Sequence, residues 1–183
     1  MIFETDRLIL RRWEESDAED LYKCACDPDV GPVCGWMPHK DVRESLYIIK
    51  NIFSNAEAYA ICRKDDNKAI GEVELMLNGN TDMTNRDDEC ELGYWIGKDY
   101  WGKGYMPEAA KAILRHAFED LKMDTVWCAY HDGNNKSSRV QEKVGFVYHH
   151  TDENVSVPLT GEIIIHHVNI MTKEHWYKIN AHK

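Results

Sequence analysis

Apolar residues recur at two spacings along the chain, and these spacings predict the order of its secondary-structure elements. Short apolar or alternating runs predict strands, and apolar positions three and four residues apart predict helices. The predicted strands cover 8–11, 58–62, 69–77, 90–96, 125–130, 146–149 and 162–171, and the predicted helices cover 16–26, 41–53, 109–121 and 134–144. Strands therefore open and close the chain around a central strand–loop–helix segment, which is typical of an α+β fold.

Polar residues at the helix ends support these boundaries. Ser16 with Glu19, and Asp41 with Glu44, have the capping-box spacing that starts a helix. Gly145 follows the helix predicted over 134–144, where glycine commonly ends a helix in a left-handed conformation.

Length and composition indicate one continuous domain over residues 1–183, with 43% hydrophobic and 30% charged residues. No apolar run approaches the roughly 20 residues that a membrane span needs. The N-terminus lacks the pattern of a signal peptide, so we expect a cytoplasmic protein. Six cysteines without a CxxC pair are expected to be reduced, mostly buried thiols.

The charge balance excludes one class of partner. With 32 acidic and 22 basic residues, the formal net charge is −10. Nucleic-acid binding requires a basic surface, so we expect no nucleic-acid partner, and we expect no membrane partner either. An acidic surface is compatible with a cationic substrate such as an amine.

The segment Trp101-Gly102-Lys103-Gly104-Tyr105-Met106 joins a predicted strand to a predicted helix. A helix N-terminus presents unpaired N–H groups, and glycines let the backbone approach a phosphate closely, so this loop is a candidate anion site. A tight strand-to-helix turn is the alternative interpretation. The loop is not a Walker A motif, because that motif needs Lys-Ser/Thr where Tyr105-Met106 stands. It is not a dinucleotide-binding fingerprint either, because that fingerprint needs a third glycine where Pro107 stands.

Three ordered segments resemble the GNAT superfamily of N-acetyltransferases. They are residues 91–96, residues 101–109, and residues 134–146 with Asn134, Ser137, Arg139, Gly145 and Phe146. The likeness is greatest to the branch of ribosomal-protein N-terminal acetyltransferases, whose first strand residues 4–11 also resemble. The resemblance implies a mixed, bent central sheet flanked by helices on both faces. It also implies direct acetyl transfer from acetyl-CoA to a primary amine, and it is compatible with a homodimer.

The resemblance implies where acetyl-CoA binds. Its pyrophosphate would lie on the backbone of Trp101, Gly102, Lys103, Gly104, Tyr105 and Met106. The backbone of Trp95 and Ile96 would pair with the pantetheine arm and support the thioester oxyanion. The Lys103 side chain either adds charge to this site or is an exposed loop lysine. Asp99 stands where the family usually has Gln or Arg.

Acetyl transfer to an amine needs a group that removes a proton. The resemblance gives this role to Glu91, with Glu89, Glu72 and Glu74 as competitors. It assigns Ser137 to the departing CoA thiolate, as a proton donor or as a hydrogen-bond donor. Asn134 either binds the cofactor or caps its helix.

The acceptor is expected to contact Trp36 and Tyr47, although both aromatics are equally interpretable as core residues. A protein or peptide N-terminus is the expected acceptor. A small amine (a polyamine, amino acid or antibiotic) and a non-catalytic acyl-CoA-binding module are the alternatives. No metal site is expected, because adjacent residues such as His149-His150 and His166-His167 alternate faces on a strand.

Overall fold

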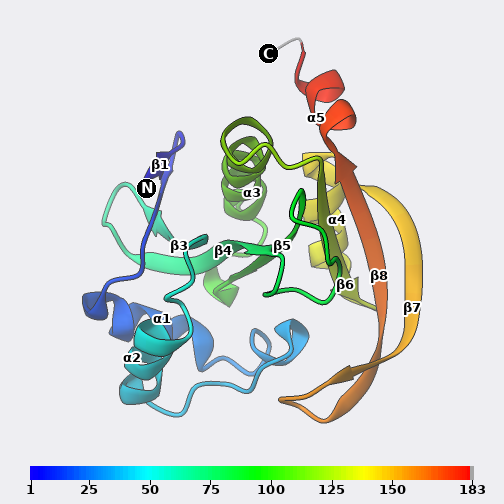
Figure 1. Ribbon diagram of the computed structural model, residues 1–183. Coiled ribbons are helices and arrows are strands. Elements are labelled where there is room, and N and C mark those ends of the chain that lie inside the picture. Colours follow the sequence, from blue (N-terminus) through cyan, green and yellow to red (C-terminus); the bar gives the residue numbers. More distant parts are fainter. Residues whose placement is uncertain (182–183) are drawn as a thin grey trace. The chain divides into compact units, whose positions relative to one another are not determined.

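The computed structural model describes residues 1–181, and its strands and helices alternate in the order expected for an α+β protein (Figure 1). Within these residues, eight strands form one mixed sheet in the order β1-β2-β3-β4-β5-β6-β8-β7. The α+β class and the mixed sheet are thereby confirmed. Residues 182 and 183, the end of the predicted domain, lie outside the described residues.

The chain divides into two compact units, which are described separately. Unit 1 comprises residues 1–74, 94–112 and 158–160, and unit 2 comprises residues 75–93, 113–157 and 161–183. Strands β4 (Ala69–Leu77) and β5 (Glu89–Ile96) each contribute residues to both units.

Unit 1 begins with an antiparallel meander. β1 (Phe3–Glu4), β2 (Leu8–Arg11), β3 (Ala58–Arg63) and β4 pair in chain order. The sequence predicted β2, β3 and β4 as strands, but it did not predict β1. The helices α1 (Ala18–Ala25) and α2 (Val42–Asn51) interrupt the meander between β2 and β3. Figure 1 shows these two helices side by side.

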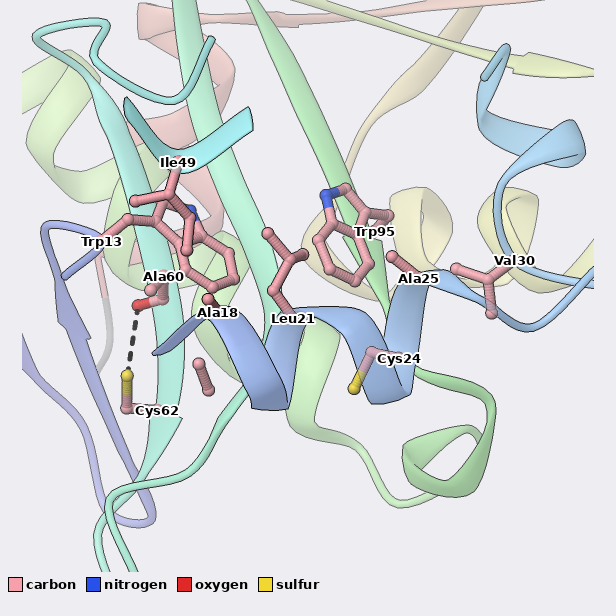
Figure 2. Close-up of a cluster of buried hydrophobic side chains, with 11 residues drawn as sticks. Trp13, Ala18, Leu21, Cys24, Ala25, Val30, Ile49, Ala60, Cys62 and Trp95 are labelled. Atoms are coloured by element: carbon pink, nitrogen blue, oxygen red, sulfur yellow. Dashed lines mark hydrogen bonds between the residues drawn. The ribbon is translucent and has the colours of Figure 1, made fainter. Parts of the chain in front are cut away.

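The core of unit 1 is an apolar cluster between the helices and the strands (Figure 2). The Trp13 ring stacks on the Trp95 ring, with ring centroids 6.4 Å apart, and on the Phe53 ring, with ring centroids 5.2 Å apart. Figure 2 shows Leu21 of α1 among them. The cluster buries large aromatic surfaces, which supply much of the stabilisation of a small core.

The first helix begins differently from the prediction. The capping box is formed by Glu14 and Asp17, ahead of a 3-10 turn at Glu15–Asp17, and not by Ser16 and Glu19. Asp17 forms this cap because its carboxylate binds two groups at once. It accepts from Glu14 N–H at 2.9 Å and from the Arg11 guanidinium at 2.7 and 2.8 Å. At α2 the predicted cap is confirmed, because Asp41 accepts from Glu44 N–H at 2.9 Å.

Unit 2 holds a parallel strand pair and a long hairpin. β5 pairs in parallel with β6 (Thr125–His131), from Glu89 with Thr125 to Glu91 with Trp127. β8 (Glu162–Thr172) lies antiparallel between β6 and β7 (Val147–Val157). Figure 1 shows β7 and β8 running beside each other along their length. The helix α4 (Asn135–Val144) ends at Gly145, whose φ is +104°, as predicted.

Helix α3 (Tyr105–Arg115) opens in unit 1 and runs on into unit 2, where a π-helical turn at His116–Asp120 extends it. The predicted helical stretch to Leu121 is confirmed, but the π turn was not predicted. Two more differences concern the C-terminal part. β7 continues eight residues beyond the predicted strand end, to Val157, and the sequence did not predict α5 (Lys173–Asn180).

The expectation about adjacent histidines is wrong for one pair. The Nδ1 atoms of His149 and His150 lie 2.7 Å apart, so both rings lie on one side of β7. The register of β7 shifts between Tyr148 and His150, and this irregularity breaks the alternation of faces. Within residues 1–181 no group of three or more His, Cys, Asp or Glu side chains is arranged to hold a metal ion.

Most of the cysteines are buried, as the sequence analysis expects. Four of the six thiols, those of Cys24, Cys62, Cys90 and Cys128, are buried. In this part of the chain, no helix has both the length and the apolar character needed to cross a membrane.

Candidate functional site

The glycine loop forms an open backbone cradle at the start of α3. Gly102 and Gly104 have φ angles of +74° and +79°, a left-handed conformation that side chains disfavour. A Cβ at Gly102 would meet no atom within 4 Å, so this side of the loop is open. Within residues 1–181, no N–H group from 102 to 106 donates to a backbone carbonyl. Such a run of amides at a helix N-terminus fits a phosphate group.

Two side chains, those of Trp101 and Lys103, make contacts that stabilise the glycine loop. Trp101 Nε1 donates to the Ile96 carbonyl at 2.9 Å, which ties the loop to the end of β5. The Lys103 ammonium lies 5.6 Å from the centre of the Tyr100 ring. Trp101 therefore has a structural role in the loop, and the Ile96 carbonyl already has a partner there.

The end of β5 lies unusually close to β4 at Gly71. A Cβ at Gly71 would lie 2.8 Å from Ile96 Cα and still closer to the Trp95 carbonyl oxygen. Gly97 N–H donates to the Ile70 carbonyl at 2.8 Å just beyond this point. Glycine at position 71 thus permits the close approach of the two backbones. The sequence analysis did not single out Gly71.

Among the expected acceptor residues, Trp36 and Tyr47 differ in their surroundings. The Trp36 ring meets the Trp95 ring edge-on at 5.7 Å and approaches His39 at 5.3 Å. Unit 1 therefore brings together one predicted acceptor residue and one predicted cofactor residue. Tyr47 is 60% exposed on α2, outside the apolar cluster.

Glu91 is a half-buried carboxylate near the middle of β5. Thr81 Oγ1 donates to Glu91 Oε2 at 2.5 Å. Burial raises the pKa of Glu91 above its usual value, and the hydrogen bond from Thr81 opposes this rise only in part. A carboxylate with a raised pKa is a stronger base than an exposed one. Thr81 lies in the polar loop 78–88, and nothing in the sequence marked it as the partner of Glu91.

Two competing glutamates have their oxygens engaged elsewhere. Glu89 Oε2 accepts from Trp127 Nε1 at 2.8 Å and from Thr84 Oγ1 at 2.7 Å, and Arg86 lies 3.2 Å from Glu89 Oε1. Glu72 is 3% exposed in unit 1 and accepts from Trp13 Nε1 at 2.7 Å.

Helix α4 carries Asn134 and Ser137 in a local network of unit 2. Asn134 caps the helix, because its Oδ1 accepts from Ser137 N–H at 3.2 Å. Gln141, which is fully buried, donates to Ser137 Oγ at 3.3 Å and to the Ala129 carbonyl at 3.2 Å. The Gln141 Oε1 atom accepts from Asn169 Nδ2 at 2.7 Å. Gln141 is one helical turn after Ser137, and this spacing is the one signal that could have identified it.

The predicted site residues are divided between the two units. Unit 1 contains Trp36, Tyr47, Trp95, Ile96 and the loop 101–106, and unit 2 contains Glu91, Asn134 and Ser137. β5 carries residues of both groups, because the boundary between the units falls between Gly93 and Tyr94 of this strand.

Comparisons with known proteins agree with this assembly of motifs. Residues 7–147 match the family model described as an acetyltransferase (GNAT) domain. The chain is 26% identical over 147 residues to the uncharacterized N-acetyltransferase p20 of Bacillus licheniformis, which covers 78% of this chain and 80% of that protein. It is 40% identical over 68 residues to the putative ribosomal N-acetyltransferase YdaF of Bacillus subtilis (strain 168), covering 37% of this chain and 36% of that one.

A solved structure resembles the whole fold. The crystal structure of a GNAT-family acetyltransferase from Bacillus anthracis covers 95% of this chain and 99% of its own, with a TM-score of 0.82 at 20% identity. The family model extends over most of the chain and includes both the glycine loop and α4. The chain therefore belongs to the GNAT acetyltransferase family and is an N-acetyltransferase.

Proposed function

We propose that this protein transfers the acetyl group of acetyl-CoA directly to a primary amine, with a protein or peptide N-terminus as the acceptor. The observation that carries the proposal is the open glycine cradle at the start of α3. GNAT proteins generally use acetyl-CoA as cosubstrate, and the cradle fits the pyrophosphate of that molecule.

The proposed binding mode uses backbone groups of unit 1. The N–H groups of Gly102, Gly104, Tyr105 and Met106 would bind the pyrophosphate, helped by the positive end of the α3 dipole. The backbone of Trp95 and Ile96 would hold the pantetheine arm. The Ile96 carbonyl already accepts from Trp101, so the N–H groups of this segment are the better candidates for the thioester oxyanion.

The proposed base is Glu91. An amine acceptor is mostly protonated at neutral pH, and it can attack the thioester carbonyl only after it loses a proton. The Glu91 carboxylate would take this proton directly or through a water molecule. The amine nitrogen then bonds to the acetyl carbon, the carbon–sulfur bond breaks, and CoA leaves as a thiolate. Ser137 would donate a hydrogen bond to the departing sulfur.

The peptide acceptor is favoured by one comparison. YdaF, which shares 40% identity with part of this chain, is named a putative ribosomal N-acetyltransferase. The net charge of −10 also suits a cationic acceptor, whether a peptide or a small amine.

The acceptor class is tested by measuring CoA release from acetyl-CoA with N-terminal peptides and small amines in parallel. We expect the peptides to give the higher kcat/KM. A preference for polyamines, amino acids or aminoglycosides would overturn the peptide assignment but keep the transfer reaction. Binding of acetyl-CoA without CoA release for any amine would overturn the transfer reaction.

The base assignment is tested with Glu91→Gln. We expect kcat/KM to fall by about 10²–10⁴, the usual contribution of a positioned base. In the native enzyme, kcat/KM should fall on the acid side of the pH profile with an apparent pKa above 4.5, because the pKa of Glu91 is raised. This acid limb should be absent from the profile of Glu91→Gln. Two acceptor peptides with different amine pKa values separate this limb from titration of the substrate. Glu89→Gln is the matched control on the same strand, and an unchanged acid limb in Glu91→Gln would refute the assignment.

A further inference from the structure

Arg7 contacts the glycine loop at three consecutive residues, Lys103, Gly104 and Tyr105. The Arg7 Nη1 atom donates to the Lys103 carbonyl at 2.9 Å. The same guanidinium lies 4.5 Å from the centre of the Tyr105 ring, in a cation–π contact with the first residue of α3. A Cβ at Gly104 would lie 3.4 Å from Arg7 Nη2, so the guanidinium packs directly against that glycine.

The same side chain also pairs with an acid in the first turn of α3. Arg7 Nε donates to Glu108 Oε2 at 2.7 Å, and Nη2 lies 2.6 Å from that oxygen. Glu108 Oε1 accepts from Thr5 Oγ1 at 2.6 Å and from Arg7 N–H at 2.8 Å. Burial alone would raise the pKa of Glu108, but the hydrogen bonds from Thr5 and Arg7 outweigh burial and lower it. Glu108 is therefore an ionised carboxylate next to the proposed pyrophosphate site.

The bond to the Lys103 carbonyl has a consequence for the next amide. In a trans peptide the C=O and the following N–H point in opposite directions. When Arg7 binds the Lys103 oxygen, the Gly104 N–H is therefore turned away from Arg7. Gly104 has a left-handed φ of +79°, a conformation that residues with a Cβ disfavour.

The charge of Glu108 makes a second contribution. A carboxylate near a helix N-terminus stabilises the helix, but it also repels an anionic ligand that binds there. The paired guanidinium compensates this charge. Because the Arg7 side chain is 47% exposed, its ion pair contributes little to global stability, so its main effect is local.

We propose that Arg7 is a positioning residue for the CoA pyrophosphate. It aims the Gly104 N–H at the ligand and compensates the charge of Glu108. The inference rests on the proposed function, because it assumes that the loop binds CoA. Arg7 precedes Gly104 by almost a hundred residues, and its side chain contacts Lys103, Tyr105 and Glu108.

The test compares Arg7→Met with the native protein by calorimetric titration of CoA and of pantetheine, which lacks the pyrophosphate. We expect CoA to bind about tenfold or more weakly to Arg7→Met, as follows from losing a charged hydrogen bond and exposing a carboxylate. Binding of pantetheine should change by less than twofold. Lys50→Met is the matched control, because Lys50 pairs with Glu15 in another part of unit 1 and should leave CoA binding unchanged.

Two further variants separate the two contributions. Adding Glu108→Gln to Arg7→Met should restore roughly threefold of the lost affinity, since the uncompensated charge is removed. Arg7→Lys keeps a cation but not the fork, so it should show a smaller loss than Arg7→Met.

The outcomes are distinct. CoA binding within twofold of native in Arg7→Met, or equal weakening of CoA and pantetheine, would overturn the positioning role. If the native protein binds no CoA at millimolar concentration, the proposed function fails first, and the inference fails with it.

Discussion

Replacing Gly71 with alanine should displace the end of β5, where the proposed pantetheine contacts lie. The added Cβ would lie 2.8 Å from Ile96 Cα and closer still to the Trp95 carbonyl oxygen. Both atoms belong to the backbone, so no side-chain rotation can relieve the overlap. Interiors are close-packed, and the end of β5 would have to retreat by up to about 1 Å to restore normal contact.

The magnitude of the effect follows from this displacement. Overpacking of this kind costs about 1–3 kcal/mol of unfolding free energy. For a protein of this length each kcal/mol lowers Tm by about 2–4 °C. A 1 Å displacement of a positioned reactant costs up to about a hundredfold in rate, so we expect kcat/KM for acetyl-CoA to fall by about tenfold to a hundredfold.

The assay combines thermal unfolding with acetyl-CoA kinetics, and Gly161→Ala provides the control. Gly161 has a φ of +73° and open space around it, so its variant should lose about 1–2 kcal/mol through backbone strain alone. It should keep native kinetics. If Gly71→Ala loses stability but keeps native kcat/KM, then the close approach at Gly71 is structural and does not position the cofactor. A variant as stable as the native protein would refute the packing argument itself.

Two stability predictions concern buried charges. Burial, together with nearby Glu74, raises the pKa of Glu72, so the folded state binds more protons than the unfolded state and native stability falls as pH rises above about 4.5. In Glu72→Gln the free energy of unfolding should not show this decrease with pH, and the variant should be at least as stable as the native protein at pH 7.5. Urea titrations at several pH values measure both quantities. Lower stability of the variant at every pH would contradict the prediction. Asp17→Ala should cost about 3–5 kcal/mol in urea unfolding, because it leaves the Arg11 guanidinium buried and unpaired, and a loss below about 1 kcal/mol would contradict this.

The fold was predictable where local patterns and tertiary pairing agree. The strands β2 to β6 are apolar runs, and each was predicted to within a few residues. β7 was predicted too short because it continues through Asp152-Glu153-Asn154, a polar stretch that has the composition of a loop. Pairing with β8 keeps this stretch extended, and only the tertiary structure supplies that partner.

The missed helix α5 has a similar explanation. It is eight residues long and mostly polar, so its pattern is too short to indicate a helix. Trp176 anchors it by stacking on Phe118 at 5.5 Å, and this contact joins residues far apart in the chain. The contacts of Arg7 with Lys103 and Glu108 are equally distant in sequence, so no local pattern could indicate them.

Sequence spacing alone cannot decide which glutamate acts as the proposed base. Glu72 and Glu74 lie on β4, Glu89 and Glu91 lie on the neighbouring β5, and their sequence positions allow any of them to act as the base. The environments of Glu72 and Glu89 distinguish these two from Glu91, because Glu89 is engaged by Trp127, Thr84 and Arg86 and Glu72 is enclosed with Trp13. Glu91 accepts one hydrogen bond, from Thr81, and stays half-buried with a raised pKa. A carboxylate with a raised pKa binds a proton more readily, and this favours Glu91 over Glu72 and Glu89 as the proposed base.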